Sequence, residues 1–145
     1  MKSNLHLLIA LIFLIGCEKN QPAKLSLPLG SVHYNTLSLR SDKLWYKKDS
    51  NEPFSGDFFE MSGNAKWSEG TVDNGKMTKW VKYHLNGNRK SKQVWKNGNL
   101  AGIQTKWHSN GKKFIELNYK DGEELSASYW NKKGKTVNDI EDARK

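Results

Sequence analysis

Glycine recurs at a nearly constant interval through much of the chain, and this repeat limits the possible fold more than any other feature. One series is spaced by 24, 24 and 23 residues: Gly63, Gly87, Gly111 and Gly134. A second, offset series is spaced by 23 and 24 residues: Gly75, Gly98 and Gly122. An aromatic residue stands four positions before each glycine of the first series: Phe59, Tyr83, Trp107 and Trp130. Such a period indicates an array of structural repeats, each packing mainly on its neighbours.

Each repeat contains two glycine turns, which leaves segments of about six to eight residues, the length of a strand. Turns such as Asn97-Gly98 and Asn110-Gly111 tolerate the positive φ that type I′ hairpins need. Between turns, apolar side chains alternate with polar ones, as at Ile115, Leu117 and Tyr119. We therefore predict an all-β fold, an elongated antiparallel meander of stacked β-hairpins with seven or eight strands between about residues 44 and 137.

The apolar content favours a single sheet over a thick core. Hydrophobic residues make up 36% of the 145 residues, and part of this share lies in an N-terminal apolar run. The periodic aromatic residues would form a ladder on one concave face of the sheet. We expect this ladder to supply much of the apolar burial.

The first sixteen residues have the pattern of a signal peptide. Lys2 precedes an apolar run at residues 5–15, which is too short to span a bilayer. The run ends in "LIGC", which resembles the lipobox of bacterial lipoproteins. This resemblance implies cleavage before Cys17, its lipidation, and attachment to a membrane of the bacterial cell envelope. In a Gram-negative host, the resemblance to the sorting rule of such lipoproteins leaves the outer membrane open as the destination, since Glu18 rather than Asp follows Cys17. The alternative is an ordinary secretory signal with an accidental cysteine.

Cys17 is the only cysteine, so the chain forms no internal disulfide. The stretch after it carries Pro22, Pro28 and Gly30 without periodicity, as a tether would. We divide the chain into a signal peptide (1–16), a lipidated cysteine and flexible tether (17–40), a β-hairpin repeat domain (41–137) and a polar tail (138–145).

The repeat segments resemble a known family. The stretch "PFSG" and the recurring pattern of an aromatic residue shortly before Asn-Gly, as in "KYHLNGN", "VWKNGNLAG" and "KWHSNGKKF", look like the variant MORN repeat of bacterial YwqK-like proteins. The resemblance covers about residues 44–135. It implies an elongated, twisted sheet of stacked hairpins. The family's frequent label makes a toxin-neutralising protein, either antitoxin or immunity-like, the alternative function.

Candidates for catalysis are sparse. His84 and His108 occupy equivalent repeat positions, but the other units have Glu60 and Asn131 there, as a solvent-facing position would. The glycines follow a turn pattern and not that of a phosphate-binding loop. We expect a non-enzymatic protein with no catalytic residues, no metal and no cofactor.

Positive charge is concentrated in the later repeats. The formal net charge is +9, and residues 76–135 hold fourteen basic and four acidic residues. Basic residues interleaved with tryptophans form our candidate binding face: Lys82, Arg89, Lys90, Lys92, Lys96, Lys106, Trp95 and Trp107. We expect a protein or an anionic envelope surface as partner, and no nucleic acid, because an exported lipoprotein seldom meets any. The alternative is a solvated face whose lysines discourage edge-strand pairing.

The function predicted from the sequence is therefore that of a non-enzymatic, membrane-anchored envelope lipoprotein whose repeat sheet binds a macromolecular partner.

Overall fold

A computed structural model describes residue 27 and residues 29–145. Its strands are β1 (Val32–His33), β2 (Leu37–Leu39), β3 (Trp45–Lys47), β4 (Gly56–Ser62), β5 (Ala65–Asp73), β6 (Lys76–Tyr83), β7 (Arg89–Lys96), β8 (Asn99–Leu100), β9 (Gly102–Trp107), β10 (Lys113–Lys120), β11 (Glu123–Trp130) and β12 (Thr136–Val137). Two short helices complete it, the 3₁₀ helix η1 (Tyr34–Thr36) and α1 (Ile140–Arg144). The predicted signal peptide and Cys17 lie outside the described residues.

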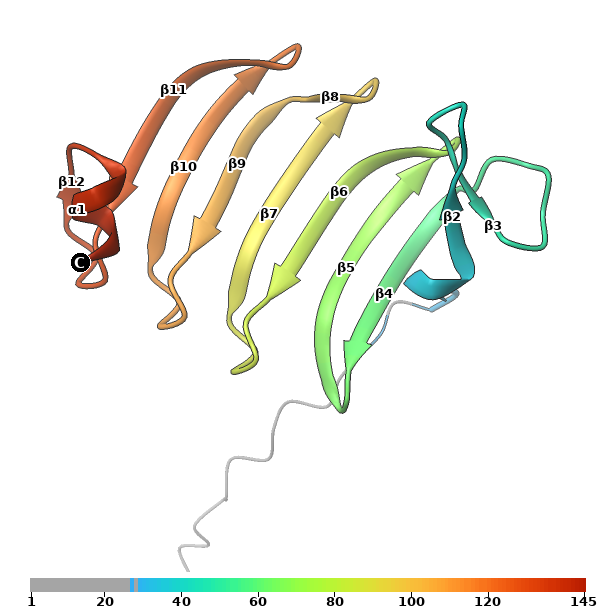
Figure 1. The fold of residues 1–145 in the computed structure, drawn as a ribbon, viewed down its shortest axis with the longest axis horizontal. Coiled ribbons are helices and arrows are strands. Elements are labelled where there is room, and N and C mark those ends of the chain that lie inside the picture. Colours follow the sequence, from blue (N-terminus) through green and yellow to red (C-terminus); the bar gives the residue numbers. More distant parts are fainter. Residues whose placement is uncertain (1–26, 28) are drawn as a thin grey trace, which may run out of the picture.

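Ten of the strands form one long sheet, as the glycine period predicts (Figure 1). Its order is β1-β4-β5-β6-β7-β9-β10-β11-β12, with β8 paired to β7, and the pairs from β4 to β12 are antiparallel. The exception is β1, which joins β4 in parallel. The predicted all-β meander of hairpins is confirmed.

The two glycine series form two rows of turns, one at each end of the strands, and these rows make the two long edges of the sheet (Figure 1). At Asn74-Gly75, Asn97-Gly98 and Asp121-Gly122 both residues have positive φ, between 45° and 91°. These two-residue loops close β5–β6, β7–β8 and β10–β11 and are the predicted type I′ turns.

The other row uses a different turn. At the β6–β7 connection, the Gly87 N–H donates to the His84 carbonyl and the His84 N–H donates to the Asn88 carbonyl, at 2.9 and 2.8 Å. Only the glycine has positive φ. This is a type I turn followed by a left-handed glycine, a common three-residue hairpin loop. The same bonds recur around Gly111 and Gly134. The expectation of type I′ turns is wrong for this row.

The folded region begins before residue 41. β1 pairs with β4, and β2 pairs with β3 in a separate two-stranded sheet. Between them, the Tyr34 ring lies 5.4 Å from that of Phe58 and 5.5 Å from those of Trp45 and Trp80. Residues from 32 onward are therefore part of the domain and not of the tether.

The apolar core lies at this N-terminal end. Its buried members are Leu37, Phe54, Phe58 and Val72, with Val32, Tyr34, Trp45, Met77 and Trp80 packed against them. The predicted ladder is only half-buried and lies on the opposite face, because Phe58 and Phe59 are consecutive in β4. The expectation that the ladder supplies much of the burial is wrong, since its repeat spacing keeps the rings on separate hairpins.

The polar tail is also ordered in part. Asp139 caps α1 by accepting a 2.9 Å hydrogen bond from the Asp142 N–H. The helix contacts β10, β11 and β12, and its Ala143 is fully buried. One turn of helix thus covers the C-terminal end of the sheet.

Candidate binding surface

The register of the strands separates the side chains into two faces. Cross-strand partners share a face, and successive residues in a strand alternate. One row of partners runs through Lys82, Ser91, Lys106 and Ile115. We name the face that carries this row and Trp80 the Trp80 face. The adjacent row of Val81, Lys92 and Thr105 lies on the other side, which we name the Tyr83 face.

The predicted basic residues do not form one face. Lys82, Lys106 and Trp95 lie on the Trp80 face, whereas Arg89, Lys92 and Trp107 lie on the Tyr83 face. Lys90 is the extra residue of a β-bulge between β6 and β7, and Lys96 is the last residue of β7. The expectation of a single basic, aromatic face is therefore wrong. From the sequence, a side chain can be assigned to a face only by the two-residue period of a strand. Each β-bulge adds one residue and so moves the following side chains to the opposite face.

Some of these residues have local partners. The ammonium of Lys82 lies 4.5 Å from the ring centroid of Trp80, and that of Lys90 lies 5.8 Å from the ring centroid of Trp67. The Trp107 carbonyl is 3.0 Å from Nε2 of His84.

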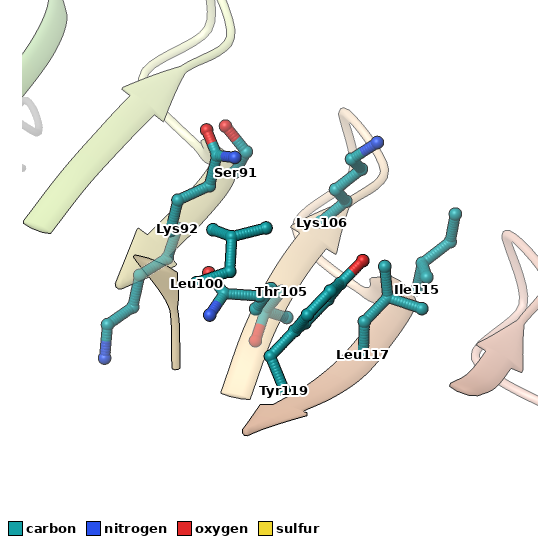
Figure 2. A pocket seen from close by; sticks show the side chains of 10 residues that line it. Ser91, Lys92, Leu100, Thr105, Lys106, Ile115, Leu117 and Tyr119 are labelled. Atoms are coloured by element: carbon teal, nitrogen blue, oxygen red, sulfur yellow. The ribbon is translucent and has the colours of Figure 1, made fainter. Parts of the chain in front are cut away.

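The Trp80 face contains a depression of about 290 Å³ over β7 to β10 (Figure 2). Its apolar lining consists of Leu100, Ile115, Leu117 and Tyr119. Its polar lining includes Ser91, Gln93 and Lys106. The core packs over β4 to β6 and α1 contacts β10 to β12, so the depression lies between the two covered ends of the sheet.

Gln104, also in the lining, is 6% exposed and has a structural task. β7 pairs with β9 only at Ser91 and Lys92, since β8 intervenes further along β7. The Gln104 side chain fills the gap. Its Oε1 accepts from the Val94 N–H at 2.7 Å, and its Nε2 donates to the carbonyls of Val94 and Ala101 at 3.0 and 2.9 Å. This amide joins the two strands, and nothing in the sequence pattern indicated it.

Tyr119 closes one side of the depression. Its hydroxyl donates a 3.1 Å hydrogen bond to Oε2 of Glu124, which raises the pKa of Tyr119. The phenol is thus held in place, with its ring available to the depression.

His84 and His108 are structural, and their position is not simply solvent-facing as the repeat comparison suggested. Nε2 of His84 lies 3.0 Å from the Trp107 carbonyl, and Nε2 of His108 lies 2.9 Å from the Trp130 carbonyl. Each ring joins one repeat to the next. Among residues 27 and 29–145, no group of three or more His, Cys, Asp or Glu side chains is placed to hold a metal ion.

The Tyr83 face carries one half-buried charged cluster that sequence reasoning missed. The Tyr83 hydroxyl and the Lys66 ammonium both donate to the carboxylate of Glu69. Burial opposes the charge on Glu69, but the two hydrogen bonds and the positive charges of Lys66 and Lys79 together outweigh it and lower the pKa of this carboxyl. Burial and the bond to Glu69 raise the pKa of Tyr83. The three residues come from two adjacent strands, β5 and β6, and only their register brings them together.

Comparison of the chain with protein-family models, curated proteins and solved structures found no match. The resemblance to the variant MORN repeat stays a prediction from the repeat motif. No helix of the described part of the chain has the length and apolar character needed to cross a membrane.

Proposed function

We propose that the protein is a non-enzymatic, membrane-anchored envelope lipoprotein that binds a protein partner through the Trp80 face of its sheet. The observation that supports this proposal is the depression between the N-terminal core and α1. Its apolar lining can receive an apolar side chain, and Lys106 at its margin suits a carboxylate beside that side chain. An apolar anchor with a charged neighbour is a common arrangement at the centre of protein interfaces.

The Gln104 side chain in the lining of the depression supports the same proposal. The Gln104 amide is already bonded to backbone groups of Val94 and Ala101. A partner therefore gains little from polar contact with this amide and more from apolar contact with Leu100 and Leu117. Because strand pairing fixes the backbone that carries these side chains, the partner does not have to order a loop on binding.

A photoreactive residue tests the binding face. Leu117 and Asn118 are consecutive in β10 and therefore lie on opposite faces. A photoreactive side chain at position 117 should cross-link a partner in the native envelope, and the same group at position 118 should not. The purified partner should then lose affinity for the L117E variant and retain it for N118E. Equal cross-linking from both positions would contradict the proposal.

The anchor is tested separately. Lipidation of Cys17 would add several acyl chains, which together hold a protein firmly on a membrane. The C17A variant should therefore leave the membrane fraction, and its retention there would contradict the lipoprotein assignment. A captured partner whose toxic activity is abolished in a stoichiometric complex would instead identify the toxin-neutralising alternative.

A further inference from the structure

One long edge of the sheet carries a row of positive charges. The turns that join β6–β7, β9–β10 and β11–β12 follow one another along this edge (Figure 1). Their segments 85–90, 108–113 and 131–135 contain no acidic residue. They contain seven exposed basic residues: Arg89, Lys90, Lys112, Lys113, Lys132, Lys133 and Lys135. We name this surface the basic edge.

The opposite edge has a different charge. Its turn segments 73–76, 96–99 and 120–124 contain three basic residues and four acidic ones. The basic ones are Lys76, Lys96 and Lys120, and the acidic ones are Asp73, Asp121, Glu123 and Glu124. The net positive charge of the turns therefore lies on one edge only, a distribution that the overall composition does not require.

The turns of the basic edge are held in a fixed line. Asn86 donates from Nδ2 to the Ser109 carbonyl at 2.7 Å, and Asn110 repeats this bond to the Lys132 carbonyl at 2.8 Å. Each turn is thus bonded to the next. Because a repeat contains two strands, neighbouring turns are about 10 Å apart and the row extends over roughly 19 Å.

Most of these charges are not neutralised within the part of the chain that the structure describes. Lys113 forms a 2.6 Å ion pair with Glu116, and Lys112 donates to the Lys133 carbonyl. The five other side chains form no hydrogen bond or ion pair among the described residues: Arg89, Lys90, Lys132, Lys133 and Lys135. Such a row attracts anions along its whole length.

We propose that the basic edge binds a linear acidic polysaccharide, a polymer with carboxylate groups along an extended chain. The charges form a line with regular steps, and a stretched polymer can place an anionic group at each step. The side chains do not converge on a cavity, so a small single anion would not be enclosed. Leu85 is the only aliphatic side chain in the three segments, whereas protein interfaces depend on several apolar anchors. This surface is separate from the depression near Leu117, and each proposal can fail without the other.

Two matched variants of the full chain test this proposal. One variant, R89Q/K132Q/K135Q, removes three charges from the basic edge that have no internal partner. The other, K76Q/K96Q/K120Q, removes three charges from the opposite edge. Binding of fluorescently labelled polygalacturonate is measured in a non-ionic detergent. The first variant should bind about tenfold more weakly than the parent chain and the second within about twofold, with all affinities falling as salt is added. Equal weakening in both variants would overturn the proposal.

The length of the polymer gives a second criterion. Affinity should increase with the number of uronate residues until an oligomer spans the row of about 19 Å. An affinity that is independent of length would overturn the proposal. Stronger competition by micelles doped with phosphatidylglycerol would assign the basic edge to a membrane surface instead, and stronger competition by poly-glutamate would assign it to an acidic protein.

Discussion

Gly70 lies directly opposite Phe58 in the β4–β5 pair, and the Phe58 ring occupies the space that a side chain at position 70 would need. A Cβ at this position would lie 2.5 Å from Cζ of Phe58 and 2.4 Å from the Lys79 carbonyl oxygen. Trp80 pairs with the same glycine from the other side. The two rings meet across it, edge to face, with centroids 5.8 Å apart. The missing side chain thus allows the central aromatic contact of the core.

The G70A variant should therefore be strongly destabilised. The added methyl group would displace a Phe58 ring that is 1% exposed, and overpacking of this kind costs about 1–3 kcal/mol. Urea unfolding measures the change. Gly87 is the control, because a Cβ there meets nothing within 4 Å. The positive φ of Gly87 should still cost G87A about 1 kcal/mol. A G70A variant as stable as G87A would contradict the role assigned to this gap.

Replacement of Gln104 should separate β7 from β9. Without its amide, the Val94 N–H loses the partner that the 6% exposed Gln104 side chain provides, at a cost of about 1–3 kcal/mol. Chemical denaturation of Q104A measures this cost, and hydrogen exchange should show faster exchange of the Val94 amide. Q93A is a matched control on the same face and should change stability by less than about 0.5 kcal/mol. Unchanged protection of Val94 in Q104A would show that the side chain does not join the strands.

The histidines should each stabilise one boundary between repeats. H84A and H108A should each lower the free energy of unfolding by about 1 kcal/mol, because each removes one hydrogen bond to a carbonyl. The two bonds lie in different repeats, so their effects should add to within about 0.5 kcal/mol in the double variant. NMR should find Nε2 protonated in both rings, since only an N–H can donate to a carbonyl. A ring protonated only at Nδ1 would argue against the bond.

Glu69 should make stability depend on pH. Its pKa is lowered in the folded state, so its contribution is present above the pKa of the unfolded chain and is lost as the pH falls through the lower folded value. E69Q should cost about 1 kcal/mol near neutral pH, a figure that allows for solvent screening of a partly exposed group. The difference between E69Q and the parent chain should shrink in acid. Thermal unfolding of both chains from neutral to acidic pH measures this difference. A difference that stays constant with pH would exclude the linkage.

The arrangement of hairpins could be predicted from the sequence because its signals are local. An Asn-Gly or Asp-Gly pair every 11 to 13 residues, with alternating side chains between, is sufficient for strands and turns. The type of turn was harder. Asn97-Gly98 and Asn110-Gly111 have the same two residues, yet the first closes a two-residue loop and the second ends a three-residue one. Strand register decides between them, and register depends on pairing beyond the turn.

Neither the core residues nor the residues that share a face could be predicted, because both depend on contacts between distant segments. Tyr34 and Leu37 belong to a segment without periodicity, and their burial depends on contacts with Phe58 and Trp80 from distant strands. The faces of Lys82 and Lys92 became certain only with the register. Bulges such as that at Lys90 shift the alternation by one residue.

The bonds from Asn86 and Asn110 to the following turn have a consequence for how such a chain can change in length. Each unit offers the next the same amide and the same carbonyl, so duplication of one 24-residue unit would insert two strands whose contacts with both neighbours repeat those already present. The N-terminal core and α1 would remain as end pieces. The molecule would grow by about 10 Å per duplication, and its row of exposed cations would lengthen in proportion. Gene duplication could therefore tune the reach of this protein while leaving its chemistry the same.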